Sequence, residues 1–222
     1  MSMTNYWENR VADLLKRGQP ITMDGGKTIS VSAPINIHYA LGVVDHRREN
    51  SLVVELNDTV AVNTAAGWKL YQVTAGAGAL AVAQPSYPGV NDEVIVDGAA
   101  TLTEQYTNIE NGTAFIEPAG ADYARVAVEC NMTNFSGTQG AGTTAASSGT
   151  DATIENNVDV TFPDAPTEAY TTGFIFMFGW FDEAVAGNLC ERNTLSAGPI
   201  QIGLGSTGNK FGPSGLVIQV DK

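Results

Sequence analysis

Four short segments in the second half of the chain each have the pattern of a turn followed by a strand. They are residues 117–128, 160–163, 178–182 and 187–189. Within residues 123–128 the even positions, Ala124, Val126 and Val128, are apolar, whereas the odd positions are mixed. One apolar face and one mixed face are typical of a half-buried strand in an antiparallel sheet. This series therefore predicts a mainly β fold of short strands and turns.

The last third of the chain extends this pattern, because residues 173–180 and 200–220 again consist of strand-forming residues and turns. Phe174, Phe176 and Phe178 occupy alternate positions, so we expect them to share one face of a strand. Residues 136–152 are small, polar and of low complexity, which indicates an exposed loop or arm. Such an arm could stay free or could become ordered against a neighbouring subunit.

The series resembles bacteriophage tail fibre and tail fibre-like virion proteins. In that family a Gly-rich turn leads into a Tyr-Ala-Arg strand, here residues 123–125, and a Phe-Pro pair follows a polar segment, here Phe162-Pro163. A Phe-Gly-x-Phe-Asp strand end runs into Gly-Asn-Leu, here residues 178–182 and 187–189. The resemblance covers residues 113–222 and, more loosely, the first 45. It implies a structural virion protein of the small fibre or decoration type.

Composition argues against several other classes. A formal net charge of −13 and the lack of clustered Lys and Arg argue against nucleic-acid binding. We expect neither membrane insertion nor Sec export, because no apolar run approaches about 18 residues and the N-terminus has no apolar signal core. Cys130 and Cys190 could form a disulfide, but the low cysteine density favours two reduced thiols.

Residues 5–17 carry the one convincing helix pattern, with Asn5 and Glu8 placed as an N-cap and its partner, and with Gly18 placed to end the helix. The apolar residues at helical spacing are Trp7, Val11, Leu14 and Leu15. This stripe could dock on the chain's own sheet or could anchor the protein to a neighbour. We favour docking on its own sheet, because such a stripe is what a single helix needs to pack on a sheet. In the other case, the candidate assembly contacts are Trp7, Val11 and Leu14.

Residues 46–112 are interpreted as an inserted module. In the related phage proteins, the strand that matches residues 34–41 runs almost directly into the Gly-Tyr-Ala-Arg turn. The intervening residues resemble a small β module of phage tail and fibre proteins, with a Gly-rich turn, a Pro-x-aromatic-Pro loop and a final hairpin. Asp97-Gly98 predicts that hairpin, because a type I′ turn needs positive φ at both central positions. Leu102 stands where the module usually has an aromatic residue.

Three aromatic residues of the insert, Trp68, Tyr71 and Tyr87, are candidate contacts for a glycan or another partner, because exposed rings stack on sugars. The alternative is that they belong to the core, as most aromatic residues of small β modules do. Trp68 and Tyr71 fall on opposite faces of one strand, so we expect at least one buried ring.

We expect no catalytic residue, cofactor or metal. The two histidines, His38 and His46, have no second ligand at usable spacing, and the common catalytic motifs are absent. Asp182-Glu183 could bind a cation such as calcium, but the chain has no run of alternating ligands, so a solubilising role is favoured. A glycan hydrolase would need a cleft with paired carboxylates.

Together these observations predict a mainly β protein: an antiparallel, sandwich-like scaffold of residues 19–45 and 113–222, an N-terminal helix in residues 1–18, and the small β module at 46–112. The predicted function is a non-enzymatic, fibre-like component of a tailed-phage virion, attached to tail or neck. Alternatives are a head-decoration protein on the capsid and a receptor-binding adhesin for host glycans. We expect a homo-oligomer, with a trimer as the first choice, assembled in the host cytoplasm. Partners should bind the insert and residues 136–152.

Overall fold

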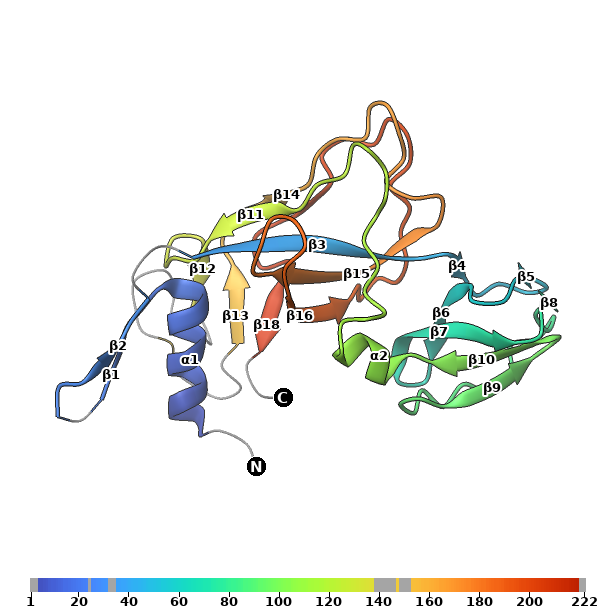
Figure 1. Cartoon of the computed structure of the whole chain (residues 1–222), viewed down its shortest axis with the longest axis horizontal. Coiled ribbons are helices and arrows are strands. Elements are labelled where there is room, and N and C mark those ends of the chain that lie inside the picture. Colours follow the sequence, from blue (N-terminus) through green and yellow to red (C-terminus); the bar gives the residue numbers. More distant parts are fainter. Residues whose placement is uncertain (1–3, 24, 32–34, 138–146, 148–152, 220–222) are drawn as a thin grey trace.

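The computed structural model describes residues 4–23, 25–31, 35–137, 147 and 153–219. Over this part of the chain the protein is mainly β, with antiparallel sheets, an N-terminal helix α1 (Asn5–Arg17) and a short helix α2 (Tyr106–Glu110). The predicted fold class is therefore confirmed. Figure 1 shows a larger scaffold lobe around strand β3 and a smaller module lobe, with α2 at their junction. Neither of the described helices has the length and apolar character to cross a membrane.

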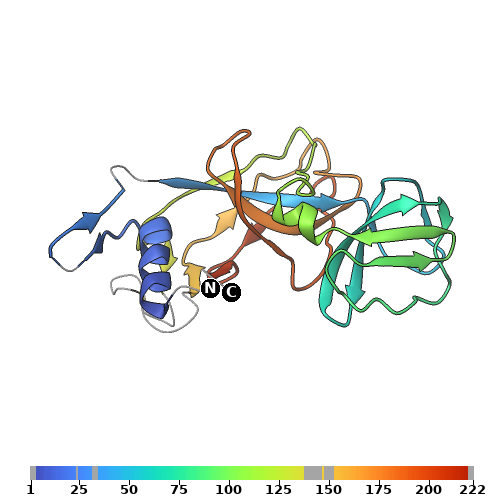
Figure 2. The same cartoon turned by 60° about the horizontal axis from the view of Figure 1, so that its bottom comes forward.

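The scaffold lobe is built around a four-stranded antiparallel sheet. Its order is β11 (Val126–Glu129), β3 (Asn36–Val44), β15 (Phe174–Phe181) and β16 (Leu189–Thr194). A second sheet has the order β12 (Phe135–Ser136), β13 (Thr153–Asn156) and β18 (Val217–Gln219), and β14 (Val160–Thr161) pairs with β17 (Lys210–Phe211). A hairpin of β1 (Ile21–Thr22) and β2 (Thr28–Ile29) extends away from the lobe (Figures 1 and 2). The buried core of this lobe includes Ile37, Phe135, Ile154, Tyr170 and Ile175.

The module lobe contains a five-stranded sheet and one small strand pair. The sheet order is β4 (His46–Arg47), β6 (Thr59–Thr64), β7 (Gly67–Ala75), β10 (Ala100–Glu104) and β9 (Val94–Asp97), while β5 (Val53–Val54) pairs with β8 (Gly78–Ala79). Alternate residues of these strands point into a core of their own, which includes Val60, Val62, Tyr71, Val73 and Leu102. The module lobe thus buries apolar surface without help from the scaffold.

A third apolar cluster joins the two lobes. Ala61 and Leu70 of the module are buried together with Ala40, Phe176 and Met177 of the scaffold. The module is therefore packed against the scaffold, not held at a distance by a linker. The division of the chain into separate units at residues 46 and 112 stays a prediction. The shared cluster shows that the two units are not packed independently of each other.

A bulge in β15 changes the expected pattern of its phenylalanines. The pairing of β15 with β3 shifts register between Ile175 and Met177, so that Phe176 is an extra residue. A bulge of this kind moves the following residues to the opposite face of the strand. Phe176 packs in the cluster between the lobes, whereas Phe178 packs against the scaffold core. The prediction that Phe174, Phe176 and Phe178 share one face is therefore wrong at Phe178.

Candidate interaction surfaces

Helix α1 has the predicted bounds, but it docks with the opposite face. Gly18 ends the helix with φ of 63°, as predicted, while the N-cap is Thr4, whose side chain makes no capping hydrogen bond. The buried positions of α1 are mainly polar, and they include Asp13, Lys16 and Arg17. The prediction that the apolar stripe packs on the chain's own sheet is therefore wrong.

A buried ion pair fixes the polar face of α1. Arg17 Nη1 donates to Asp13 Oδ1 at 2.7 Å, and Arg17 Nε donates to the carbonyl oxygen of Phe135 at 3.3 Å. The other carboxylate oxygen of Asp13 accepts the backbone N–H of Ser147 at 2.8 Å. Buried charges are tolerated when they are paired and hydrogen-bonded in this way. The helix is thus tied to parts of the chain that are distant in sequence.

Lys16 makes a second polar anchor beside this ion pair. Its Nζ lies 3.4 Å from the ring centroid of Trp180 and 3.7 Å from Glu191 Oε2. Burial lowers the pKa of Lys16 to about 8, because desolvation outweighs the attraction of Glu191. Trp180 Nε1 donates to the same oxygen of Glu191 at 2.9 Å, so the three side chains form one contact between α1 and β15–β16.

The apolar stripe of α1 is the outer face of the helix. Tyr6 is 53% exposed and Trp7 is 37% exposed, and the two rings meet edge to face with centroids 6.0 Å apart. Val11 and Leu14 are half-buried. The three predicted assembly contacts, Trp7, Val11 and Leu14, therefore lie together on an accessible surface, although their role in assembly stays a prediction.

The three aromatic residues predicted to contact a glycan do not form a shared surface. Tyr71 and Tyr87 are buried and meet edge to face with centroids 5.1 Å apart. Their hydroxyl groups donate to Glu93 and to Asp97 respectively, and burial raises the pKa of both. Rings enclosed in this way cannot stack on a sugar, so the core alternative holds for these two residues.

Trp68 instead closes the contact between the lobes. It packs against the cluster that joins the lobes, and the Arg47 guanidinium carbon lies 5.4 Å from its ring centroid. Gly198 of the scaffold lies directly against the ring: a Cβ at this position would be 2.5 Å from Trp68 Cε2. Trp68 and Leu70 face this cluster while Tyr71 and Val73 face the module core, which confirms the predicted alternation of β7.

Asp97 is a structural centre that the sequence interpretation missed. Its carboxylate is fully buried and accepts hydrogen bonds from Arg48 Nε at 2.9 Å, the Tyr87 hydroxyl at 2.8 Å and the Ala81 N–H at 2.8 Å. The predicted hairpin exists, but Asp97 pairs with Ala100, so that the two turn residues are Gly98 and Ala99. Gly98 has φ of 63° at the first turn position, while Ala99 at the second is not among the residues with positive φ, which is the pattern of type II′ and not of the expected type I′.

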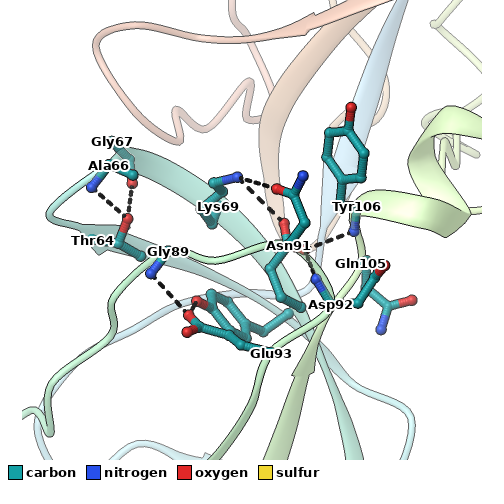
Figure 3. Close-up of polar contacts among 12 residues, drawn as sticks. Thr64, Ala66, Gly67, Lys69, Gly89, Asn91, Asp92, Glu93, Gln105 and Tyr106 are labelled. Carbon is teal, nitrogen blue, oxygen red and sulfur yellow. Dashed lines mark hydrogen bonds and ion pairs between the residues drawn. The ribbon is translucent and has the colours of Figure 1, made fainter.

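A second carboxylate fastens the loop before β9 to the start of α2 (Figure 3). Buried Glu104 accepts the backbone N–H groups of Asp92 at 2.7 Å and Tyr106 at 2.9 Å. Lys69 Nζ donates to Asn91 Oδ1 at 3.2 Å and lies 3.8 Å from Glu104 Oε1. Figure 3 shows the Tyr106 ring pointing away from these contacts. The network holds a loop in place and leaves one aromatic ring accessible.

Residues 117–128 form a braced turn in which the strand begins later than expected. The predicted strand starts at residue 123, whereas β11 starts at Val126. Arg125 donates to Glu117 through Nε at 3.0 Å and through Nη1 to the carbonyl oxygen of Ala186 at 2.6 Å. The Tyr123 hydroxyl donates to Glu117 at 2.9 Å and accepts the Leu41 N–H at 3.0 Å. The motif therefore joins β3 to the loop after β15, which is a scaffold role.

A groove of about 420 Å³ opens beside β16 and β18. It is lined by Phe178, Asn193, Thr194, Leu195, Ser196, Ala197, Gly198, Ile200, Phe211, Gly215 and Val217, none of which is charged. A cavity of about 10 Å³ shares Phe178, Asn193 and Val217 with it. Tyr39 lines this cavity, and its hydroxyl group is buried without a hydrogen-bond partner among the described residues. Sequence periodicity gave no sign of the groove, because it lies between two different sheets.

The histidines, carboxylates and cysteines that were considered for metal or redox chemistry do not cluster into one site. In the described ranges no three His, Cys, Asp or Glu side chains are placed to hold a metal ion. Asp182 accepts the Asn188 N–H at 2.7 Å, and His46 Nε2 lies 2.9 Å from Asp58 Oδ2. Both cysteines are free, with Cys130 buried and Cys190 exposed.

Comparison with known protein families gives a match. A family model described as podophage GP4 fiber I protein gp80 matches residues 100–203. The matched region contains all four segments of the turn–strand series and leaves most of the module lobe outside. Comparisons with curated proteins and with solved structures gave no match. The family match supports a phage fibre-type protein over this part of the chain.

Proposed function

We propose that the protein is a non-enzymatic structural component of a tailed-phage virion, fibre-like and attached to the tail or neck as a homo-oligomer. The observation that carries the proposal is the match of residues 100–203 to a podophage fibre family. The match falls on the braced motif of Glu117, Tyr123 and Arg125, whose side chains serve packing and not chemistry. The fibre role is therefore preferred to the head-decoration and adhesin alternatives.

The exposed stripe of α1 supports attachment to another virion protein. The buried pair of Asp13 and Arg17 holds the polar face inward, so the apolar face cannot turn toward the chain's own core. Contiguous exposed apolar surface on a protein commonly marks a binding site. In this proposal Trp7, Val11 and Leu14 contact a tail, neck or capsid subunit.

The adhesin alternative has lost its main candidate contacts. Tyr71 and Tyr87 are buried, and Trp68 faces the scaffold. The inserted module is instead proposed to act as a rigid extension of the scaffold. Recognition of a host glycan would then have to use other residues.

Particle composition tests the proposed function. We would introduce Trp7→Ser, Val11→Ser and Leu14→Ser together into the phage and measure the protein in purified particles by mass spectrometry. The expected result is loss of the protein from particles, while the melting temperature of the purified variant shows that it folds. A matched variant with Val53, Leu56 and Val82 of the module changed to serine should be incorporated normally, because these exposed residues lie outside the stripe.

Electron microscopy with a labelled antibody distinguishes the positions. Label at the tail or neck supports the proposal, and label spread over the capsid supports the decoration alternative. Absence of the protein from purified wild-type particles would overturn the virion role itself.

A further inference from the structure

The hairpin of β1 and β2 contains a strand-like segment that does not pack against the core of the protein. Residues 28–31, Thr-Ile-Ser-Val, are uncharged and alternate polar with apolar residues, as a half-buried strand does. In the structure Thr28, Ile29 and Ser30 are exposed, and Ile29 has 44% of its surface accessible. Among the described strands β2 pairs with β1 and with no other, so its second edge is open. Two-stranded hairpins of this kind are marginally stable unless they pack against something.

The groove beside β16 and β18 has the complementary properties. β16 ends one sheet and β18 ends another, so each offers an unpaired edge within the described structure. The N–H of Leu195 bonds to β15, so the N–H of Thr194 points to the open side, where it donates to Asn193 Oδ1 at 2.9 Å. The apolar part of the lining includes Ile200 and Phe211. Ile200 is 47% exposed.

We propose that residues 28–31 of one copy of the chain occupy this groove on a second copy. The segment adds a strand to the open edge of β16, and the Ile29 side chain enters the apolar part of the groove, between Ile200 and Phe211. The inference deepens the proposed homo-oligomer and rests on it. In chemical terms, an uncharged extended segment meets an uncharged groove by β-strand addition.

Charge favours this pair of surfaces over others. Each copy carries a net charge of −13, so two copies repel one another unless they meet through uncharged surfaces. Both the segment and the groove lining lack charged side chains. A segment docking in its own groove is disfavoured, because the hairpin points away from β16 and β18 in both views (Figures 1 and 2).

Cross-linking between two differently tagged chains tests the contact. One chain carries Ile29→Cys and the other Ile200→Cys, both in a Cys190→Ser background, because Cys190 is exposed. Burial raises the pKa of Cys130 to about 11, so this thiol reacts slowly at neutral pH. With a short bis-maleimide, the expected product is a covalent dimer that carries both tags. A matched pair of Ile29→Cys with Val82→Cys, an exposed position of the module, should give far less of it.

A surface variant gives an independent measurement. Ile29→Asp should weaken self-association by about tenfold or more, because it removes a buried isoleucine from the contact and places a charge there. Ile35→Asp is the matched control, since Ile35 is also exposed but lies outside residues 28–31. Light scattering at several protein concentrations would measure both effects.

The outcomes separate this inference from the proposed function. The exchange of the segment would be overturned if the protein formed oligomers but gave no more cross-linked dimer than the control pair. It would also be overturned if a single chain that carries both cysteines formed the cross-link within itself. Both results would leave a homo-oligomer in place. A monomer at all concentrations would overturn both the exchange and the homo-oligomer. Neither result would bear on whether the protein is incorporated into particles, which the α1 variants measure separately.

Discussion

Both lobes expose apolar residues and sheet edges, as Val94 and Val96 do on the edge strand β9 of the module, but the two lobes differ in how their polar groups and accessible surfaces are arranged. Asp97 and Glu104 each collect several hydrogen bonds inside the module. The scaffold instead exposes the stripe of α1, the hairpin of β1 and β2, and an uncharged groove. A helix stripe and a groove beside a strand edge are both shapes that another protein chain can occupy. Partners should therefore be sought there first. The sequence interpretation suggested the insert and residues 136–152 instead, and most of the latter segment lies outside the described residues.

The largest expected effect comes from breaking the closed centre of the module. Asp97→Asn removes the charge that Arg48 faces while nearly preserving volume, so it leaves a buried guanidinium without its counter-charge. We expect the free energy of unfolding to fall by about 3–5 kcal/mol. Urea denaturation followed by tryptophan fluorescence measures this loss.

Asp159→Asn is the control for this change. It breaks an ion pair with Lys210 in which both side chains are largely accessible, so the expected loss is at most about 1 kcal/mol. Equal losses for the two variants would show that Asp97 does not hold the module together, and the contrast between the lobes would weaken.

A smaller effect tests whether the two lobes depend on each other. Gly198→Ala places a methyl group against the Trp68 ring and also requires an alanine at φ of 84°. Gly205→Ala is a matched control, because its φ is 82° and nothing lies within 4 Å of the added methyl group. We expect a loss of about 1 kcal/mol for Gly205→Ala and about 1–3 kcal/mol more for Gly198→Ala. If the two losses were equal, the Trp68 contact would contribute little to the joint between the lobes.

The sequence predicted elements more successfully than the contacts between elements. The C-terminal end of α1 followed from a local signal, because the left-handed region costs glycine least, whereas the expected N-cap at Asn5 was wrong and Thr4 takes that position. The face with which α1 docks could not be predicted, since it depends on Asp13 meeting Ser147 and on Lys16 meeting Trp180, both far away in the chain. An apolar stripe predicts burial somewhere, whereas in the described structure Trp7 and Leu15 of this stripe are exposed.

At Asp97, at Phe176 and in the groove, too, the sequence did not predict the contacts between elements. Asp97 carried a turn signal, but it is the last paired residue of β9 and not a central residue of the turn. Its role depends on Arg48 and Tyr87, which reach it from segments outside the strands. The bulge at Phe176 left no signal in the alternation of apolar residues. The groove beside β16 exists because two sheets end near each other, which no local pattern encodes.

The smallest expected effect concerns how firmly the scaffold holds α1. The pKa of Lys16 is about 8 in the folded protein, below its unfolded value of 10.5. Between these two values the unfolded chain binds more protons, so the stabilisation rises with pH. Below pH 8 both states are protonated and the cost of burying the charge is fully present. Lys16→Met should remove this dependence, because methionine does not titrate.

The expected readout is the difference in unfolding free energy between wild type and Lys16→Met, measured in urea at steps from pH 7 to pH 10. From pH 7 to pH 10 the unfolding free energy of wild type should rise, relative to that of Lys16→Met, by on the order of 1–3 kcal/mol. The difference cancels the tyrosines that titrate in the same range, because both proteins contain them. Both proteins should also carry Cys130→Ser and Cys190→Ser, because Lys16 lowers the pKa of each thiol and the substitution would change their titration. A constant difference would mean that Lys16 is solvated in solution, and that α1 is held by Asp13 and Arg17 without the second anchor.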